Sequence, residues 1–193
     1  MSRPREVSDE EILDAARRVF IEHGPSVATS VVAKELGVSA PALFHRFGSK
    51  RALLIAALKP RRFPMFERMQ EGFATDTSLE VQLLEIAEAF GRFAKELHPC
   101  MGMVRAAGIT PEEIFASYDI PPPLRGMQAF CAFLQQAQDA GAIRPGPVLP
   151  MALAFVGGIQ GPVFLSFHLG QEVIDMDAYR PQMVANFCKG VAA

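Results

Sequence analysis

A short stretch in the first quarter of the chain places two side chains with strong hydrogen-bonding groups, His45 and Arg46, beside small apolar residues. Ser39 is a natural N-cap for a helix there, because its hydroxyl can accept a bond from an unpaired amide two or three residues later. Pro41 falls in the first turn, where a missing N–H costs little. Arginine and histidine on such a helix can bond base edges in the major groove of DNA. Residues 38–47 therefore predict a recognition helix.

The elements that would position this helix can also be identified from the sequence. Leu43 and Phe47 are four residues apart and predict the inward face of the helix. Upstream, residues 29–36 have the composition of another short helix, which Gly37 ends. Two short helices joined by a tight glycine turn have the spacing of a helix-turn-helix motif.

These residues resemble the DNA-binding domain of TetR-type transcriptional regulators, over about residues 10–58. The alternative, a chance pair of core helices, is disfavoured because several motif pieces occur at matching spacings. The family pattern is an Ile/Val-Ala, an Ala/Leu-Gly-Val-Ser turn, a Leu-Tyr-x-x-Phe and a Ser-Lys-x-x-Leu. Its counterparts here are Val32-Ala33, Leu36-Gly37-Val38-Ser39, Leu43-Phe44-His45-Arg46-Phe47 and Ser49-Lys50-Arg51-Ala52-Leu53.

The resemblance implies a set of DNA-contacting residues, and for Thr29 and Ser30 a role as a cap or plain surface residue is the alternative. Phe44 stands where the family has a tyrosine that reaches a phosphate, and without the hydroxyl it is expected either to stay near the backbone or simply to pack. Lys50 begins the next helix, where charge and helix amides both favour phosphate. The full expected set is Thr29, Ser30, Ser39, Ala40, Pro41, Phe44, His45, Arg46 and Lys50.

The charge distribution agrees with a nucleic-acid partner at one end of the chain. Residues 1–62 carry 11 Lys/Arg against 7 Asp/Glu, and residues 63–193 carry 8 against 14. A basic head on an acidic body suits a protein that approaches a polyanion from one side. The three cysteines are far apart and lack metal-ligand neighbours, so no metal site or cofactor is expected, and they suit a reduced, cytoplasmic setting. No secretory signal is expected from the charged start of the chain.

The rest of the sequence predicts an all-α protein, because no segment has strand alternation. A capping box at Ser8 and Glu11 opens a first helix, and Pro60 and Pro64 predict a kink or hinge after a fourth helix over 50–58. A further helix is expected over 78–97, broken by Pro99, followed by a short element over 101–107. A second capping box at Thr110 and Glu113, which also accounts for the acidic pair Glu112-Glu113, opens a brief helix to residue 117. Helices are then expected over about 121–140, 148–169 and 177–191.

Residues 145–171 contain no Asp, Glu, Lys or Arg, and this stretch is long enough to cross a membrane. Internal Pro and Gly residues and the absence of flanking positive anchors disfavour that interpretation. A soluble helix that is apolar on nearly all sides must be covered on all sides, so dimerisation through 148–169 and 177–191 is favoured. The resemblance implies the same, since the family dimerises through its two C-terminal helices.

We therefore expect two domains: a helix-turn-helix DNA-binding head over 1–58, which includes the start of a linking helix, and a helical ligand-binding and dimerisation body over 59–193. The resemblance implies an inducer cavity in the body, and the scarcity of charge there favours an apolar or aromatic ligand. Its candidate lining is aromatic and methionine side chains, which could equally be plain core: Phe90, Phe93, Met101, Met103, Phe115, Tyr118, Phe130, Phe133 and Phe164.

No catalytic motif is apparent, since the sequence has no HExxH, P-loop, GxGxxG or Ser/His/Asp grouping. The expected function is a cytoplasmic, ligand-responsive regulator, and on the resemblance a homodimeric repressor that leaves a palindromic operator when it binds its inducer. The alternative is an all-helical dimeric ligand-binding protein or enzyme without sequence-specific DNA binding.

Overall fold

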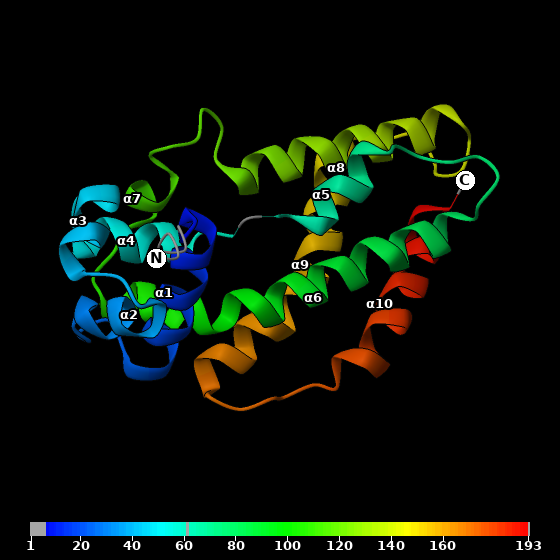
Figure 1. Ribbon diagram of the computed structural model, residues 1–193. Coiled ribbons are helices and arrows are strands. Elements are labelled where there is room, and N and C mark those ends of the chain that lie inside the picture. Colours follow the sequence, from blue (N-terminus) through cyan, green and yellow to red (C-terminus); the bar gives the residue numbers. More distant parts are fainter. Residues whose placement is uncertain (1–6, 61, 193) are drawn as a thin grey trace. The chain divides into compact units, whose positions relative to one another are not determined.

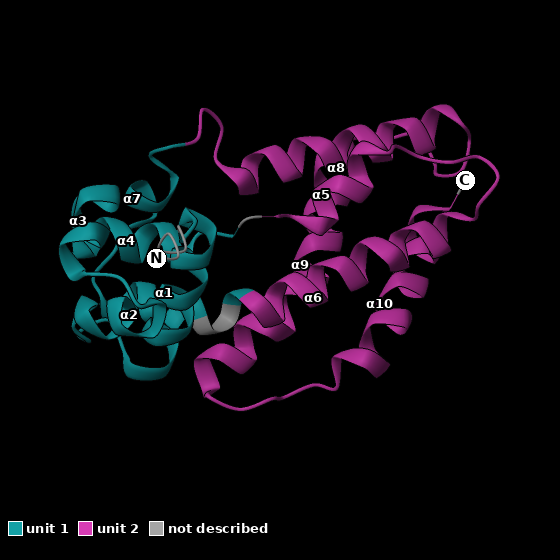
Figure 2. Ribbon diagram, in the orientation of Figure 1, with its two compact units in different colours: residues 1–61, 97–117 teal, residues 62–96, 118–193 magenta. Residues whose placement is uncertain are grey.

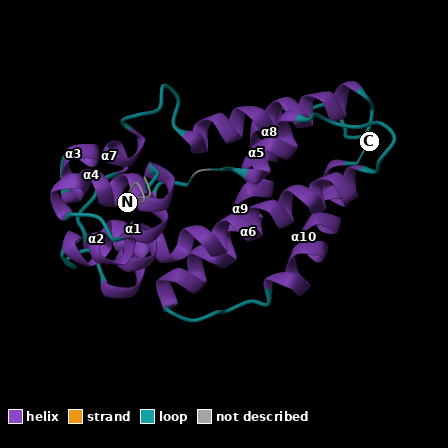
Figure 3. Cartoon of the chain, viewed as in Figure 1, coloured by secondary structure: helices purple, strands orange, loops and turns teal. Residues whose placement is uncertain are grey.

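The computed structural model describes residues 7–60 and 62–192, with the side chains of residues 98 and 99 left out. Every regular element in these ranges is an α-helix, as expected for an all-α fold (Figure 1, Figure 3). In chain order the helices are α1 (Asp9–His23), α2 (Thr29–Leu36), α3 (Ala40–Phe47), α4 (Lys50–Leu58), α5 (Pro64–Gln70), α6 (Leu79–Ala106), α7 (Pro111–Phe115), α8 (Pro122–Asp139), α9 (Val148–Leu169) and α10 (Met176–Val191).

The chain divides into two compact units, formed by residues 1–61 with 97–117 and by residues 62–96 with 118–193 (Figure 2). The first boundary is near the expected division after residue 58. The expected second domain, however, also contained residues 97–117, and these belong to the N-terminal unit. Local sequence patterns cannot show this, because the segment joins its unit through packing with residues far away in the sequence.

The first unit consists of α1 to α4 with the last part of α6 and α7. A capping box opens α1: the Ser8 side chain accepts from the Glu11 amide, and the Glu11 carboxylate accepts from the Ser8 amide. The inward stripe of α1 packs on α2 and α4. Its core is one apolar cluster, whose largest fully buried members are Ile12, Phe20, Leu43 and Leu53, and which also includes Cys100 and Ile109.

The expected break at Pro99 is wrong, since α6 continues as one helix from Leu79 to Ala106. An interior proline removes one backbone hydrogen bond and costs about 3 kcal/mol in an isolated helix. Here one face of the following turns packs in the core of the first unit, where Cys100 is 1% exposed and Met103 and Val104 are partly buried. Burying apolar surface contributes roughly 25 cal/mol per Å², so tertiary packing offsets the local cost.

The second unit consists of α5, the first part of α6, α8, α9 and α10. Its core is built largely from phenylalanine rings that contact one another: Phe130 lies 5.0 Å from Phe155 and 6.1 Å from Phe133, measured between ring centroids. Helix α5 lies on α8, and α9 packs against both α8 and α10. Gly126 allows the α5–α8 contact, because a Cβ atom there would come within 1.9 Å of the Phe66 ring.

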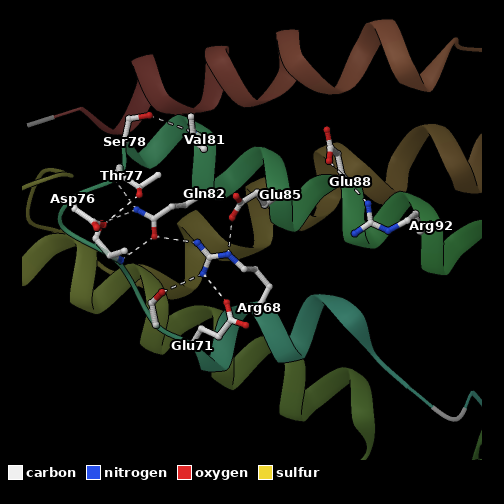
Figure 4. A network of polar contacts seen from close by, with 12 residues as sticks. Arg68, Glu71, Asp76, Thr77, Ser78, Val81, Gln82, Glu85, Glu88 and Arg92 are labelled. Carbon is white, nitrogen blue, oxygen red and sulfur yellow. Dashed lines mark hydrogen bonds and ion pairs between the residues drawn. The ribbon is translucent and has the colours of Figure 1, made fainter.

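A polar network closes the loop between α5 and α6 (Figure 4). Gln82 is fully buried, and its amide nitrogen donates to the carbonyls of Ala74 and Thr77 while its oxygen accepts from the Ala74 amide. Arg68 donates to the same oxygen and pairs with Glu85 at 2.7 Å. Buried polar groups need partners, so this network fixes the loop and ties α5 to α6.

Helix α9 has one buried and one exposed apolar face. Ala152, Phe155, Ile159 and Pro162 are buried in the core of the second unit. The helix is also long and apolar enough to cross a membrane by those two criteria alone. Its exposed large apolar side chains lie towards the two ends of the helix: Leu149, Leu153, Phe164, Leu165 and Leu169.

Candidate nucleic-acid interface

Helix α3 is positioned by its cap and by one buried side chain. The Ser39 hydroxyl accepts a hydrogen bond from the Ala42 amide, and Pro41 occupies the first turn. Leu43 is 1% exposed and anchors α3 in the core of the first unit. The opposite side of the helix therefore faces solvent, which leaves an outward face of exposed side chains: Pro41, Ala42, Phe44 and His45.

The turn between α2 and α3 needs glycine. Gly37 has a φ of +66°, a left-handed conformation that other residues rarely adopt. Its amide and that of Val38 donate to the carbonyls of Lys34 and Ala33, which satisfies the end of α2. The expected helix-turn-helix geometry is therefore present, with α3 as its second helix.

The residues expected to contact phosphate differ in how accessible they are. Thr29, the first residue of α2, is 8% exposed, so its side chain offers little to a ligand, whereas its neighbour Ser30 is exposed. Lys50 is the first residue of α4, where Ser49 caps the helix by accepting from the Ala52 amide. The ammonium group of Lys50 and the free amides of this helix terminus together favour an anion.

Two expected contacts on α3 have a different chemical character from the family pattern. Phe44 is 41% exposed, so the ring that replaces the usual tyrosine is presented to solvent rather than buried. Ala40 is half-buried next to the Ser39 cap. Both offer apolar surface and no hydrogen bond, so base recognition through them is limited to contacts such as those with thymine methyl groups.

Arg46 is bonded to the start of α1. Its Nη1 donates to the backbone carbonyl of Val7 and lies 3.3 Å from the Asp9 carboxylate. To bond a base with Nη1, Arg46 would have to exchange these partners for the base.

Arg51 forms a four-bond junction that sequence analysis did not identify. Its guanidinium donates to both Glu113 carboxylate oxygens at 2.7 Å and to the carbonyls of Ala107 and Gly108. At the other end of α4, Lys59 donates to the Ser117 hydroxyl at 2.7 Å. The segment after α6 is thus bonded to both ends of α4, within the first unit.

Glu113 has two roles in this junction. Its hydrogen bond from Arg51 and the bond from the Thr110 amide lower the pKa of its carboxyl to about 2. The sequence had shown only the second bond, since Thr110 and Glu113 form the capping box of α7. A partner 62 residues away leaves no local signal, which is why the capping box alone seemed to explain this residue.

The candidate ligand-lining residues are not gathered at one place. Met101, Met103 and Phe115 lie in the first unit, where Met101 is 47% exposed. In the second unit, Phe164 is 60% exposed on α9, while Phe130 and Phe133 are fully buried in the core. Phe90 on α6 belongs to the same core, Phe93 on α6 packs against it, and Tyr118 precedes α8 and is half-buried.

Groups suited to metal binding or nucleophilic chemistry are sparse in the described parts of the chain. No group of three or more His, Cys, Asp or Glu side chains is arranged there to hold a metal ion. Burial raises the pKa of the Cys100 and Cys131 thiols, and it raises that of Cys188 to about 11. The thiolate is the reactive form, so these cysteines are poor nucleophiles.

Comparison with known proteins finds matches to the N-terminal part of the chain. Residues 12–57 match the family described as bacterial regulatory proteins, tetR family. The chain is also 42% identical, over 65 residues, to the HTH-type transcriptional repressor AcnR of Corynebacterium efficiens. That alignment covers 33% of this chain and 35% of AcnR, so it spans only about a third of the curated relative.

The whole fold resembles solved structures at low sequence identity. One is a TetR-family transcriptional regulator from Mesorhizobium loti, with a TM-score of 0.77, 16% identity and 96% coverage of both chains. Another is SmeT in its complex with triclosan, with a TM-score of 0.70, 16% identity, and coverage of 95% of this chain and 91% of SmeT. At these identities the likeness concerns the fold.

Proposed function

The chain carries the helix-turn-helix domain of the bacterial TetR family of regulatory proteins, and from that premise we propose that it is a DNA-binding transcriptional repressor. The observation that carries the proposal is the α2–Gly37–α3 motif, with α3 capped by Ser39 and anchored by Leu43, so that its other face is open to solvent. A helix presented in this way fits the major groove of B-DNA. The AcnR likeness, which lies in one 65-residue segment, favours repression over activation.

We propose two kinds of contact at the DNA. Ser30, Ser39 and Lys50 bind phosphates, which sets affinity and register.

On α3, His45 contributes hydrogen bonds to base edges, and Pro41, Phe44 and Ala40 contribute apolar contacts. Thr29 and Arg46 remain members of this surface, but their polar groups are the least available: one side chain is buried and the other is bonded to α1.

We propose that two copies associate through α9 and α10. Helix α9 exposes five large apolar side chains, at Leu149, Leu153, Phe164, Leu165 and Leu169, and contiguous exposed apolar patches on soluble proteins often mark interfaces. A second copy placed by two-fold symmetry would cover it, since the same surface then lies on both sides of the interface. Such a dimer would bind a palindromic operator with half-sites one helical turn, about 34–36 Å, or a multiple of it apart. The proposed dimer would also explain why α9 is so apolar in a protein that we propose to be cytoplasmic and not bound to a membrane.

We propose that a small apolar or aromatic effector releases the protein from DNA by binding in the second unit. Aromatic side chains dominate that unit, and the structurally similar SmeT was solved with triclosan bound. Phe93 and Tyr118 are only partly buried, so they are better candidates for a pocket wall than Phe90, Phe130 and Phe133, which are buried in the core. An effector acts only to the extent that it prefers one conformation over another.

Selection of bound duplexes from a random pool tests the proposal, and the rival classes give different results. The expected result is one two-fold symmetric consensus. Recovery of random sequences at every salt concentration would favour a ligand-binding protein that does not recognise sequence. Turnover of any compound found to bind would instead support an enzyme, a class for which the fold and the family offer no support.

A further inference from the structure

Arg46 differs from its neighbour His45 in what surrounds it. The His45 side chain is exposed, and no hydrogen bond or ion pair joins it to any residue in the described ranges. The Arg46 side chain is only one-third exposed, and its Nη1 contacts Val7 and Asp9. Two consecutive residues on the DNA-facing helix therefore have different chemistry available to them.

Both partners of Arg46 lie at the start of α1, on either side of its N-cap residue Ser8. Val7 immediately precedes the Ser8 cap, so its carbonyl lies outside the helical bonding of α1 and requires another donor. Asp9 is the first residue of α1, where the helix dipole favours a carboxylate. The capping box of Ser8 and Glu11 holds the backbone of this turn in place. Arg46 thus connects the last turn of α3 to the capped start of α1.

The pairing also changes what Arg46 can offer to DNA. A carboxylate 3.3 Å from the guanidinium offsets much of its charge, so the pair attracts phosphate weakly. Nη1 donates to the Val7 carbonyl and lies beside the Asp9 carboxylate, so this end of the guanidinium is engaged with the start of α1. Bidentate recognition of guanine requires two parallel N–H groups pointing at the base.

We propose that Arg46 is a positioning residue, which fixes the orientation of α3 against the start of α1, and that hydrogen-bonded base recognition on α3 belongs to His45. This inference rests on the proposed function, because it assumes that α3 enters the groove. It assigns different roles to two adjacent residues that the family resemblance treats alike.

The test compares Arg46→Ala, Arg46→Lys, Asp9→Ala and His45→Ala with the wild type. The affinity of each is measured for the operator selected from a random pool and for every single-base variant of that operator, below the midpoint of thermal unfolding.

For Arg46→Ala, we expect the affinity to fall about tenfold or more, and to fall equally, within about twofold, for the operator and all its variants. Arg46→Lys should recover part of the loss, because it can still bond Val7 or Asp9. Asp9→Ala should show a smaller uniform loss, and His45→Ala should abolish the preference at particular base pairs.

Three outcomes would overturn the inference. If Arg46→Ala removes the preference at one base pair of each half-site, Arg46 reads a base directly. If Asp9→Ala binds every duplex as tightly as the wild type or more tightly, the bond to α1 does not support DNA binding. If Arg46→Ala lowers only the midpoint of thermal unfolding, the bond serves stability alone. A wild-type protein that selects no sequence would instead overturn the proposed function.

Discussion

At the scale of single residues, the proposed DNA contacts divide into those that recognise sequence and those that attract DNA. His45 is an exposed side chain with both donor and acceptor capacity, whereas Lys50 lies at a helix N-terminus, where phosphate is favoured. We predict that His45→Ala weakens binding to the selected operator more than to random DNA. Lys50→Ala should weaken both equally and lower the slope of log K against log salt by about one unit. Titrations at several salt concentrations, in which both variants lost affinity to the same extent on both duplexes, would contradict this division.

A second residue-scale prediction concerns packing in the second unit. A Cβ atom at Gly126 would lie 1.9 Å from the Phe66 ring, so Gly126→Ala must push α5 away from α8. Overpacking of this kind costs about 1–3 kcal/mol of unfolding free energy. Gly102→Ala is the matched control, because Gly102 is also helical and has nothing within 4 Å of its Cβ position. The control should be neutral or stabilising by up to about 1 kcal/mol. Equal urea midpoints for the two variants would show that the contact is not tight.

At the scale of elements, α4 is joined to the α6–α7 segment by the Arg51–Glu113 pair. The Glu113 carboxyl has a lowered pKa of about 2 in the folded protein, against 4.5 for an ordinary glutamate. Its bonds therefore contribute stability that is fully present above about pH 4.5 and is lost as the pH falls towards 2. We predict that Glu113→Gln lowers the midpoint of thermal unfolding at neutral pH, and that the difference from the wild type shrinks steadily below pH 4.5.

The control for that experiment is Glu112→Gln, since Glu112 is the exposed neighbour with no bond to Arg51. Its pKa is also lowered, chiefly by the Thr110 side chain, but it does not join α7 to α4. It should change the midpoint less than Glu113→Gln at neutral pH. A pH-independent difference for Glu113→Gln would mean that the ion pair does not stabilise this unit.

The sequence predicted elements wherever a local signal determines them. The capping boxes at Ser8 and Thr110 and the glycine at position 37 gave the helix starts and the turn correctly. Local signals failed where distant packing decided the outcome. Pro99 was expected to end a helix that in fact continues to Ala106. The interruption expected from Pro60 and Pro64 is present, since α4 ends at Leu58 and α5 begins at Pro64.

The candidate nucleic-acid interface was likewise only partly predictable from the sequence. The exposure of Pro41, Phe44 and His45 followed from the position of Leu43 on the inner face of α3. The partners of Arg46 and Arg51 did not follow, because each bond joins residues far apart in sequence. The aromatic residues of the second unit could not be sorted into core and surface for a related reason: α9 is apolar on both faces, so its pattern does not show which side is covered.

At the scale of the whole molecule, the exposed side of α9 predicts self-association. Gly157 lies on that side, and its Cβ position has nothing within 4 Å, so Gly157→Glu fits the single chain without a clash. In a dimer the same carboxylate would be desolvated, at a cost of several kcal/mol. We predict that sedimentation shows a dimer for the wild type and monomers or aggregates for Gly157→Glu.

The control for the dimer is Gln128→Glu, which adds the same charge at an exposed position of α8. It should leave the dimer intact. Gly158 is less suitable for this test, because a Cβ atom there would come within 3.1 Å of Met183 and disturb the packing of α9 on α10. A wild type that sediments as a monomer at micromolar concentration would remove the proposed interface.

The central claim is that the first unit recognises DNA by sequence, and the ratio of two dissociation constants tests it most directly. The wild-type protein is titrated against its selected operator and against a random duplex of equal length, at one physiological salt concentration. We predict that the operator binds at least about 10³-fold more tightly, as is usual for specific DNA-binding proteins. Equal dissociation constants, weakening together as salt is added, would show a basic surface without sequence recognition and would contradict the assignment of α3 as a recognition helix.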